Sequence, residues 1–523
     1  MHFRPYDELL ARAYQVTLLG GAANVLDWDQ QTYMPLKAAL TRADQLALVR
    51  GLIHRRATAA PIGELLKACE DHGFEPGSDE AANVREWRRD YDRRVRLPQK
   101  LVEEFERTST LARVAWAEAR EKSEYVIFQP YLEKILQLTR EKAEHWGYED
   151  SVYDALMEEY EPGIRTSEIK KLFAQLRPSV IELFKQAKAS DFTRKSLAGH
   201  YPIAGQKALN QAVAEALGYD LQAGRIDATL HPFSLNLGTA DCRITTRYDE
   251  TDFTVSLYAL LHEIGHGLYE QGLVAENYGT PVGETASLGI HESQSRLWEN
   301  KVGRTLAFWE NWFPIAMNYL PEVARLSPEL ITRAVNHVAP SFIRLEADEV
   351  TYDLHIILRF DLELQLFESQ LDAADVPAAW NEEFEKLFGV PVPHDRFGCL
   401  QDIHWSLGSF GYFPTYTLGN LNSAQIFARA RQECPELDHQ LGKGSYRPLL
   451  HWLRQKIHVQ GRRYLSQDLM KFATGESTQI HYQMEHLRQK VLNPLLEPDT
   501  TAAIKANEKE SYVRSTPEPA RAG

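Results

Sequence analysis

Cysteine is scarce in this chain: its 523 residues include only Cys69, Cys242, Cys399 and Cys434, and none stands in a CxxC or CxxxC spacing. Cysteines this far apart favour neither a disulfide framework nor a thiolate zinc site. Long apolar runs are also missing, since no stretch approaches the roughly 20 apolar residues of a membrane span. The N-terminus meets acidic residues before any run of signal-peptide length. We therefore expect a cytoplasmic protein with no membrane partner.

Positive charge is in deficit. The 58 Lys and Arg residues against 73 Asp and Glu residues give a formal net charge of 58 − 73 = −15. Such a chain has no general electrostatic attraction for a phosphate backbone, so we expect no nucleic-acid partner. Hydrophobic residues make up 44% and charged residues 25%, which are proportions of a chain that can bury a core.

Long glycine- and proline-rich linkers are absent as well. These residues break the chain only in short clusters such as residues 161–163, while apolar residues recur at helical spacing, as in the pattern from Leu101 to Val114. We therefore predict a mainly α-helical protein with a single large multi-helical domain over residues 1–497. Residues 498–523 lose the apolar periodicity, and we expect them to form a frayed C-terminal tail.

A weak strand signal appears around residues 242–255. Residues 243–248 and residues 253–255 alternate in polarity about the polar turn at residues 249–252. This pattern predicts a small β-hairpin immediately before the most informative segment of the chain.

That segment is His262-Glu263-Ile264-Gly265-His266, an H-E-x-x-H pentapeptide inside an apolar pattern of helical period. On a helix, positions i and i+4 point the same way, so His262 and His266 can bind one Zn²⁺ while Glu263 faces its water-bearing position. The pentapeptide alone is suggestive, because two surface histidines beside a glutamate would give the same letters.

A catalytic zinc site keeps three protein ligands and one open position. A second helical segment begins near Leu288 and could return beside the first, so Glu292, which lies 26 residues after His266, is the predicted third ligand. Glu284 and His291 are nearby rivals. On a helix His291 would point about 100° away from Glu292, so those two cannot both face the metal.

Several short motifs follow one another along the chain. They are D-x-R-x-T at 241–245, H-E-x-x-H at 262–266, H-E-S-Q at 291–294, G-x-x-Q-D-x-H-W at 398–405 and G-x-x-P-T-Y at 411–416. Through these motifs the sequence resembles the carboxypeptidase Taq family of metallocarboxypeptidases. Similar stretches at 27–35, 231–233 and 344–352 spread the resemblance over almost the whole chain.

The resemblance implies a mostly α-helical zincin-type domain, with the metal at the bottom of a deep groove beside the small hairpin or sheet, and usually a homodimer. It implies release of single C-terminal residues from short peptides with broad specificity. It also implies His262, His266 and Glu292 as ligands of one metal ion per chain and Glu263 as the catalytic base, in agreement with the spacing argument. Zn²⁺ suits this ligand set, and Co²⁺ or Mn²⁺ are alternatives because some family members work best with them.

Two further catalytic residues, His404 and Tyr416, are carried over from similar positions in the family motifs. In peptide hydrolysis the tetrahedral oxyanion needs hydrogen-bond donors beyond the metal, and an imidazole and a phenol can supply them. The alternative is that His404 is a buried histidine and Tyr416 a tyrosine that only packs between helices.

An exopeptidase must also recognise the terminal carboxylate, which a planar guanidinium binds in bidentate fashion. Arg344 is our first choice, although its acidic neighbours make a structural salt bridge an alternative. Arg359 and Arg243 are the other candidates. Arg243 could instead pair with Asp241 to fix the hairpin, whose edge could accept a substrate backbone by strand addition. Further polar groups expected to contact substrate or to orient the metal ligands are Gln401, Asp402 and His355.

Two other functions compete with a carboxypeptidase. The first is a zincin endo-oligopeptidase, since H-E-x-x-H with a downstream glutamate serves both activities. The second is a helical scaffold that binds metal without catalysis, and the presence of Glu263 argues against it.

Overall fold

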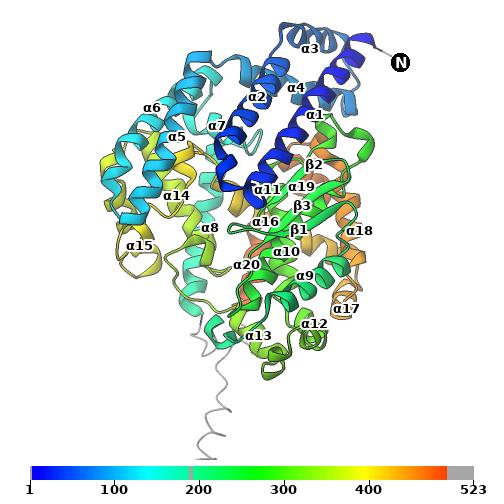
Figure 1. Ribbon diagram of the computed structural model, residues 1–523, viewed down its shortest axis with the longest axis vertical. Helices are drawn as coiled ribbons and strands as arrows, with labels where there is room; N and C mark the ends of the chain where they lie inside the picture. Colours follow the sequence, from blue (N-terminus) through cyan, green and yellow to red (C-terminus); the bar gives the residue numbers. More distant parts are fainter. Residues whose placement is uncertain (1–2, 188–192, 492–523) are drawn as a thin grey trace, which may run out of the picture.

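The computed structural model describes residues 3–187 and 193–491, and helices dominate it as predicted (Figure 1). The predicted tail at 498–523 lies outside the described residues. The α-helices are α1 (Arg4–Thr32), α2 (Ala39–Ala57), α3 (Ala60–His72), α4 (Asp79–Val95), α5 (Gln99–Lys122), α6 (Gln129–Trp146), α7 (Val152–Met157), α8 (Thr166–Gln186), α9 (Ile203–Leu217), α10 (Phe253–Glu270), α11 (Leu288–Arg296), α12 (Leu306–Tyr319), α13 (Pro328–Val335), α14 (Tyr352–Phe367), α15 (Val376–Phe388), α16 (Pro414–Glu433), α17 (Leu437–Gly442), α18 (Arg447–Lys456), α19 (Ser466–Thr474) and α20 (His481–Val491).

A small sheet lies beside α10. Its strands β1 (Gly224–Ala228), β2 (Ser234–Gly238) and β3 (Asp241–Thr246) stand in the order β1-β3-β2. β3 pairs in parallel with β1 and antiparallel with β2. A small sheet next to the H-E-x-x-H helix is therefore confirmed.

The predicted hairpin is wrong in its second half. Phe253 is the first residue of α10, because the Asp252 carboxylate accepts a hydrogen bond from the backbone N–H of Thr254 at 2.9 Å and caps the helix. The β-branched residues Thr254 and Val255 read as a strand locally, but the cap and the burial of the helix outweigh that preference. The partners of β3 come from residues 224–238 instead.

The hydrophobic core has two large parts that meet along α16. Leu418 and Leu421, near the start of α16, belong to the part that also contains α14 and α15. Ile426 and Phe427, two turns later, belong to the part around α10 and α12. One continuous helix therefore runs through both parts of the core.

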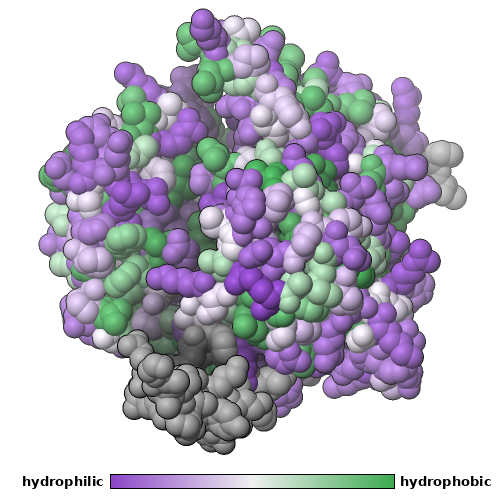
Figure 2. Space-filling view, turned by 60° about the horizontal axis from the view of Figure 1, so that its bottom comes forward, coloured by the Kyte–Doolittle hydropathy of each residue, from purple (hydrophilic) through white to green (hydrophobic). Residues whose placement is uncertain are grey.

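One face of the molecule has a recess (Figure 2). On the face shown in Figure 2, a shaded recess separates the left-hand part of the molecule from the larger right-hand part, with hydrophilic and hydrophobic residues mixed on both sides. Within residues 3–187 and 193–491, no helix combines the length and apolarity needed to cross a membrane. The apolar pattern along α5 is only half internal: Leu101 is buried, whereas Val114 is 63% exposed.

Candidate active site

Three helices approach one another very closely where the sequence predicts a metal site. A Cβ added at Gly265 of α10 would lie 2.5 Å from the carbonyl oxygen of Gln294 on α11. A Cβ added at Gly419 of α16 would lie 2.4 Å from Cγ of Glu292. Only glycine permits these approaches, so the two glycines set how near α10 and α16 come to the helix that carries Glu292.

This packing brings together the three predicted ligands. The Nε2 atoms of His262 and His266 are 3.3 Å apart, and each lies 3.6 Å from Oε2 of Glu292. In the described part of the chain, no other group of three His, Cys, Asp or Glu side chains gathers its ligand atoms in this way. The side chains of His262 and His266 remain 22% and 14% exposed, so solvent reaches the site.

Nε2 of His262, Nε2 of His266 and Oε2 of Glu292 form a triangle, called the ligand triangle below, whose size fits a divalent ion. Zinc bonds of about 2.0–2.1 Å in tetrahedral geometry separate neighbouring ligand atoms by about 3.3 Å, close to the spacing observed. Two imidazole nitrogens and a carboxylate oxygen are also donors that suit zinc and other first-row metals. The residues present therefore match the metal that the motif predicts.

Two arginines and a glutamate orient these ligands. The Nε of Arg296 donates to Oε1 of Glu292 at 2.7 Å, which leaves Oε2 for the centre of the triangle. Nδ1 of His262 lies 3.0 Å from Oε2 of Glu299, and Arg304 donates to the other oxygen of Glu299 at 2.9 Å. A carboxylate on Nδ1 fixes the imidazole tautomer with its Nε2 lone pair directed at the metal position.

Glu299 was not predicted from the sequence. It lies in a π-helical segment, η6 (Leu297–Gly303), that continues from α11. Burial opposes its charge, but the hydrogen bond with His262 and the charges of Arg304 and Arg296 hold its pKa below the ordinary value. Glu299 therefore remains an anion beside His262.

Neither rival for the third ligand joins the triangle. The ring of His291 stacks on that of His266 with centroids 4.4 Å apart, and its Nε2 pairs with Oε1 of Glu270 at 3.1 Å. Glu284 instead forms an ion pair with Arg462 at 2.9 Å. Of the three candidates, only Glu292 shares a centre with both histidines.

Glu263 is buried beside the ligands on α10. Burial raises the pKa of its carboxyl group to about 7, with the positive charge of His262 opposing this shift and the negative charge of Glu292 adding to it. A carboxyl group with such a pKa can exchange a proton near neutral pH.

His404 and Tyr416 lie next to each other. Nε2 of His404 is 3.3 Å from the Tyr416 hydroxyl group. Burial lowers the pKa of His404 to about 4, so the ring is neutral at pH 7, and burial raises the pKa of Tyr416 well above its ordinary value. Tyr416 stands one turn before Gly419 on α16, and Gly419 packs against the Glu292 side chain, so this pair lies close to the ligand triangle.

Two tyrosines of this region were not singled out from the sequence. The Tyr412 ring is 5.3 Å from the Tyr416 ring and 5.2 Å from the His404 ring. The hydroxyl group of Tyr352 accepts a hydrogen bond from Arg344 at 2.9 Å, and the Arg296 guanidinium lies 4.4 Å from the centre of the Tyr352 ring. Tyr352 thus joins the Glu292 side of the site to the His404 side.

Asp402 holds two of the predicted arginines. Nε and Nη2 of Arg344 donate to Oδ1 of Asp402 at 3.1 and 2.9 Å, and Nε of Arg359 donates to Oδ2 at 2.7 Å. The Arg344 side chain keeps 4% exposure and the Arg359 side chain none. Arg359 therefore has no surface that a substrate could touch, and its position favours a role in holding Asp402.

The remaining predicted residues have structural partners. Gln401 accepts a hydrogen bond from the backbone N–H of Arg344 at 2.9 Å and donates to the carbonyl group of Phe342 at 3.0 Å. His355 is fully buried with its ring 4.6 Å from the Phe388 ring. Both lie behind the Asp402 cluster, where they support the segment that carries His404.

Arg243 and Asp241 form the pair foreseen as an alternative. Nε and Nη2 of Arg243 donate to the two carboxylate oxygens of Asp241 at 2.8 and 2.9 Å. β3, which carries Arg243, is the central strand, so the outer edges of the sheet belong to β1 and β2. The addition of a substrate strand at an edge stays a prediction.

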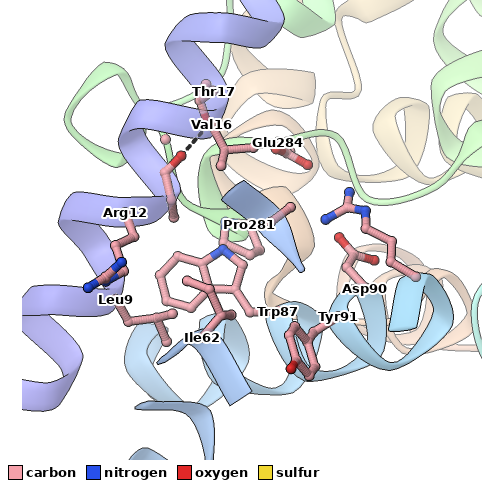
Figure 3. Close-up of a pocket in the computed structure, with 14 residues that line it drawn as sticks. Leu9, Arg12, Val16, Thr17, Ile62, Trp87, Asp90, Tyr91, Pro281 and Glu284 are labelled. Carbon is pink, nitrogen blue, oxygen red and sulfur yellow. Dashed lines mark hydrogen bonds between the residues drawn. The ribbon is translucent and has the colours of Figure 1, made fainter. Parts of the chain in front are cut away.

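A separate pocket lies between α1, α3, α4 and the turn before α11 (Figure 3). Trp87, Ile62 and Pro281 meet in its centre, and Asp90 and Glu284 stand at its edge. Apart from the rejected ligand Glu284, it contains none of the predicted site residues. The chemistry predicted from the sequence is therefore concentrated around the ligand triangle.

Comparisons with known proteins identify the family of this chain. The sequence profile of the carboxypeptidase Taq (M32) metallopeptidase family matches residues 8–491. The chain is 42% identical to thermostable carboxypeptidase 1 of Thermus thermophilus, covering 93% of this chain and 98% of that protein, and 35% identical to carboxypeptidase 1 of Bacillus subtilis, covering 90% and 95%. It superposes on the crystal structure of an M32 carboxypeptidase from Deinococcus radiodurans with a TM-score of 0.90 and 37% identity, covering 94% and 99%. The chain therefore belongs to the carboxypeptidase Taq (M32) family and is a metallocarboxypeptidase.

Proposed function

We propose that this metallocarboxypeptidase releases single residues from the C-termini of short peptides, with broad side-chain specificity. It would use one divalent ion per chain held by His262, His266 and Glu292. Zn²⁺ is the first choice and Co²⁺ or Mn²⁺ are alternatives. The observation that carries the proposal is the ligand triangle, with the buried Glu263 on the helix of the two histidines and the His404–Tyr416 pair nearby.

The ion, when bound, would supply Lewis acidity that activates a water molecule and polarises the scissile carbonyl group. Glu263 would act as the general base, taking a proton from the attacking water and passing it to the leaving amine nitrogen. The raised pKa of Glu263, about 7, suits both transfers. The ligands would be kept in place by Arg296 and Glu299.

His404 and Tyr416 would donate hydrogen bonds to the oxyanion that develops on the carbonyl oxygen. A neutral imidazole retains one N–H donor, and the phenol of Tyr416 stays protonated because burial raises its pKa. Donors preorganised in a buried site need little reorganisation as charge develops, which is why they favour the transition state.

The proposed activity is tested by the end of the peptide from which residues are released. We expect mass spectra of a peptide incubated with the enzyme to show a ladder that loses one C-terminal residue at a time. Amidation of the C-terminus should block the reaction, because the terminal carboxylate is then missing. The ladder should stall before proline, whose ring removes the amide N–H at the scissile bond. Internal fragments that appear before any single-residue loss would favour the endo-oligopeptidase.

Arg344 is the proposed partner of the substrate carboxylate. Its bonds with Asp402 and Tyr352 leave some of its five N–H groups for a ligand, and its guanidinium lies 4.7 Å from the centre of the Tyr416 ring. A charge-assisted pair of this kind is worth about 2–5 kcal/mol when one partner is removed. We therefore expect Arg344→Ala to lower kcat/KM for peptides with a free C-terminus by about 30-fold or more.

Arg243→Ala is the matched control, because Arg243 is also paired with an aspartate in a family motif. Parental kcat/KM in Arg344→Ala together with a loss in Arg243→Ala would move the role to Arg243. Metal content should be the same in both variants.

We also propose a homodimer, as the family resemblance implies. Three strongly exposed leucines support this: Leu36, Leu40 and Leu48, exposed by 93%, 84% and 63%, lie on or just before α2, which packs against α1 (Figure 1). Exposed apolar groups of this kind favour contact with another protein surface. A solution mass equal to the 59.8 kDa of one chain would overturn this proposal.

A cytoplasmic location and the lack of a nucleic-acid partner stay as proposals too. The thiols of Cys69, Cys242, Cys399 and Cys434 are all free in the structure, as expected in a reducing compartment, and the net charge of −15 disfavours phosphate backbones. Recovery of the protein in the membrane or secreted fraction of its cell would contradict the first proposal.

A further inference from the structure

Helix α14 carries ionisable residues in a place where a helix is usually apolar. His355, Arg359 and Glu363 stand at four-residue spacing on this helix, and each has 0% exposure. This spacing directs all three to one side of the helix. Burying a charge is costly unless it is paired and hydrogen-bonded, so such residues need a reason. Arg359 has one in Asp402, whereas Glu363 takes no part in the chemistry described so far.

The Glu363 carboxylate accepts three hydrogen bonds and is their common centre. The indole N–H of Trp405 donates to Oε1 at 2.8 Å. The backbone N–H of Gly411 donates to Oε2 at 3.0 Å, and the Tyr153 hydroxyl group donates to the same oxygen at 2.6 Å. Burial raises the pKa of Glu363 to about 7, so the fold keeps this group in place against a desolvation cost.

Two of these partners, Trp405 and Gly411, lie in residues 404–416, the segment that contains the proposed oxyanion donors. Trp405 follows His404 directly, and Gly411 directly precedes Tyr412. Gly411 has φ +81°, and a Cβ there would lie 2.8 Å from the backbone nitrogen of Met157 at the end of α7. The segment is therefore seated against α7, which also carries Tyr153, and a single carboxylate ties the segment at two points to α14 and α7.

We propose that Glu363 is a positioning residue for the reaction, fixing residues 404–416 so that His404 and Tyr416 are presented to the substrate carbonyl group. Its hydrogen bonds go to Trp405, Gly411 and Tyr153, and to none of the metal ligands. The inference rests on the roles of His404 and Tyr416 proposed above. Small misplacements of such donors cost much of the rate, because the transition state depends on their geometry.

Glu363→Gln tests the proposal. An amide cannot accept from all three donors, since its NH₂ group must face either the Trp405 indole or the Gly411 N–H. We expect kcat to fall about 10- to 100-fold, with KM and metal content close to parental values. Asp154→Asn is the matched control, because the buried Asp154 carboxylate accepts two hydrogen bonds from Thr166, at the start of α8, and none from the segment. It should leave kcat within about twofold even if it lowers Tm by the amount that Glu363→Gln does.

A double-mutant cycle with Tyr416→Phe separates positioning from simple loss of stability. If Glu363 acts through the segment, the loss of kcat in the double variant should be clearly smaller than the product of the two single losses, because part of each loss is the same. Effects on kcat that multiply would overturn the positioning role and leave the proposed function standing. A parental kcat in Glu363→Gln would do the same. A parental kcat in Tyr416→Phe would instead refute the role proposed for Tyr416, and the positioning role would fall with it.

Trp405→Phe provides a second route if Glu363→Gln does not fold. It removes one donor to the carboxylate and retains an aromatic ring in the core. We expect a several-fold fall in kcat at unchanged KM, and a parental kcat would overturn the proposal.

Discussion

Replacing Glu263 with glutamine should leave the metal bound and lower kcat by about 10²–10⁴-fold, the usual contribution of a general base. Glutamine has nearly the same shape as glutamate but cannot take up a proton. The three ligand side chains and the groups that orient them are untouched by the change. The fold should tolerate it, because burial already raises the pKa of Glu263 to about 7 and an amide avoids the cost of burying that charge.

The measurement is kcat for a free-carboxylate peptide, together with the metal content and Tm of the same preparation. Glu299→Gln is the matched control, a buried carboxylate that orients His262 without reaching the reaction itself. At saturating metal it should keep most of the parental kcat. If Glu263→Gln hydrolyses peptides at the parental rate with its metal bound, Glu263 is not the base.

Removal of the metal should have an equally large effect. A chelator should abolish peptide hydrolysis, and added Zn²⁺ or Co²⁺ should restore it, because the proposed ligands His262, His266 and Glu292 would leave one coordination position open for catalysis. Loss of the carboxylate that orients a metal-bound histidine typically weakens metal affinity by about 10–100-fold. Glu299→Gln should therefore need that much more metal for half-restoration, which a titration of the chelated protein would measure.

Full activity in a preparation shown to be free of metal would refute the metal-dependent mechanism. A titration in which Glu299→Gln and the parent regain activity at the same metal concentration would instead refute the role of Glu299 in orienting His262 for metal binding. These outcomes differ from those of Glu263→Gln, so the base and the metal are tested independently.

Much of the proposed ligand set could be predicted because it depends on local geometry. His262 and His266 share a face on any helix, and a second helix returning beside the first favoured Glu292. Spacing left Glu284 and His291 as rivals, the resemblance favoured Glu292, and the structure brings Glu292 together with the two histidines. The groups that orient the ligands were beyond this reasoning. Glu299 contacts His262 from a π-helical segment, and no common sequence pattern predicts such a segment.

The segment 398–416 shows a second limit. Its residues were identified from the resemblance, but their contacts come from α14 and α7, which are distant in sequence. Arg359 shows the error that results when such contacts are unknown. Its motif suggested substrate binding, whereas α14 is buried on every side and the arginine is enclosed. The second half of the hairpin was wrong for the opposite reason. The weak local strand signal at Thr254 and Val255 was outweighed by the Asp252 cap and the burial of Phe253.

The close approach at Gly265 and Gly419 also bears on how this enzyme could be engineered. Glycine within a helix usually costs about 0.5–1 kcal/mol relative to alanine, so replacing helical glycines is a common route to thermostable variants. Here a side chain at Gly265 would push α10 away from α11 and enlarge the gap between the histidines and Glu292, and a side chain at Gly419 would press on the Glu292 side chain itself. Thermal stabilisation and metal retention therefore oppose each other at these two positions, and a stabilised enzyme must gain its stability elsewhere.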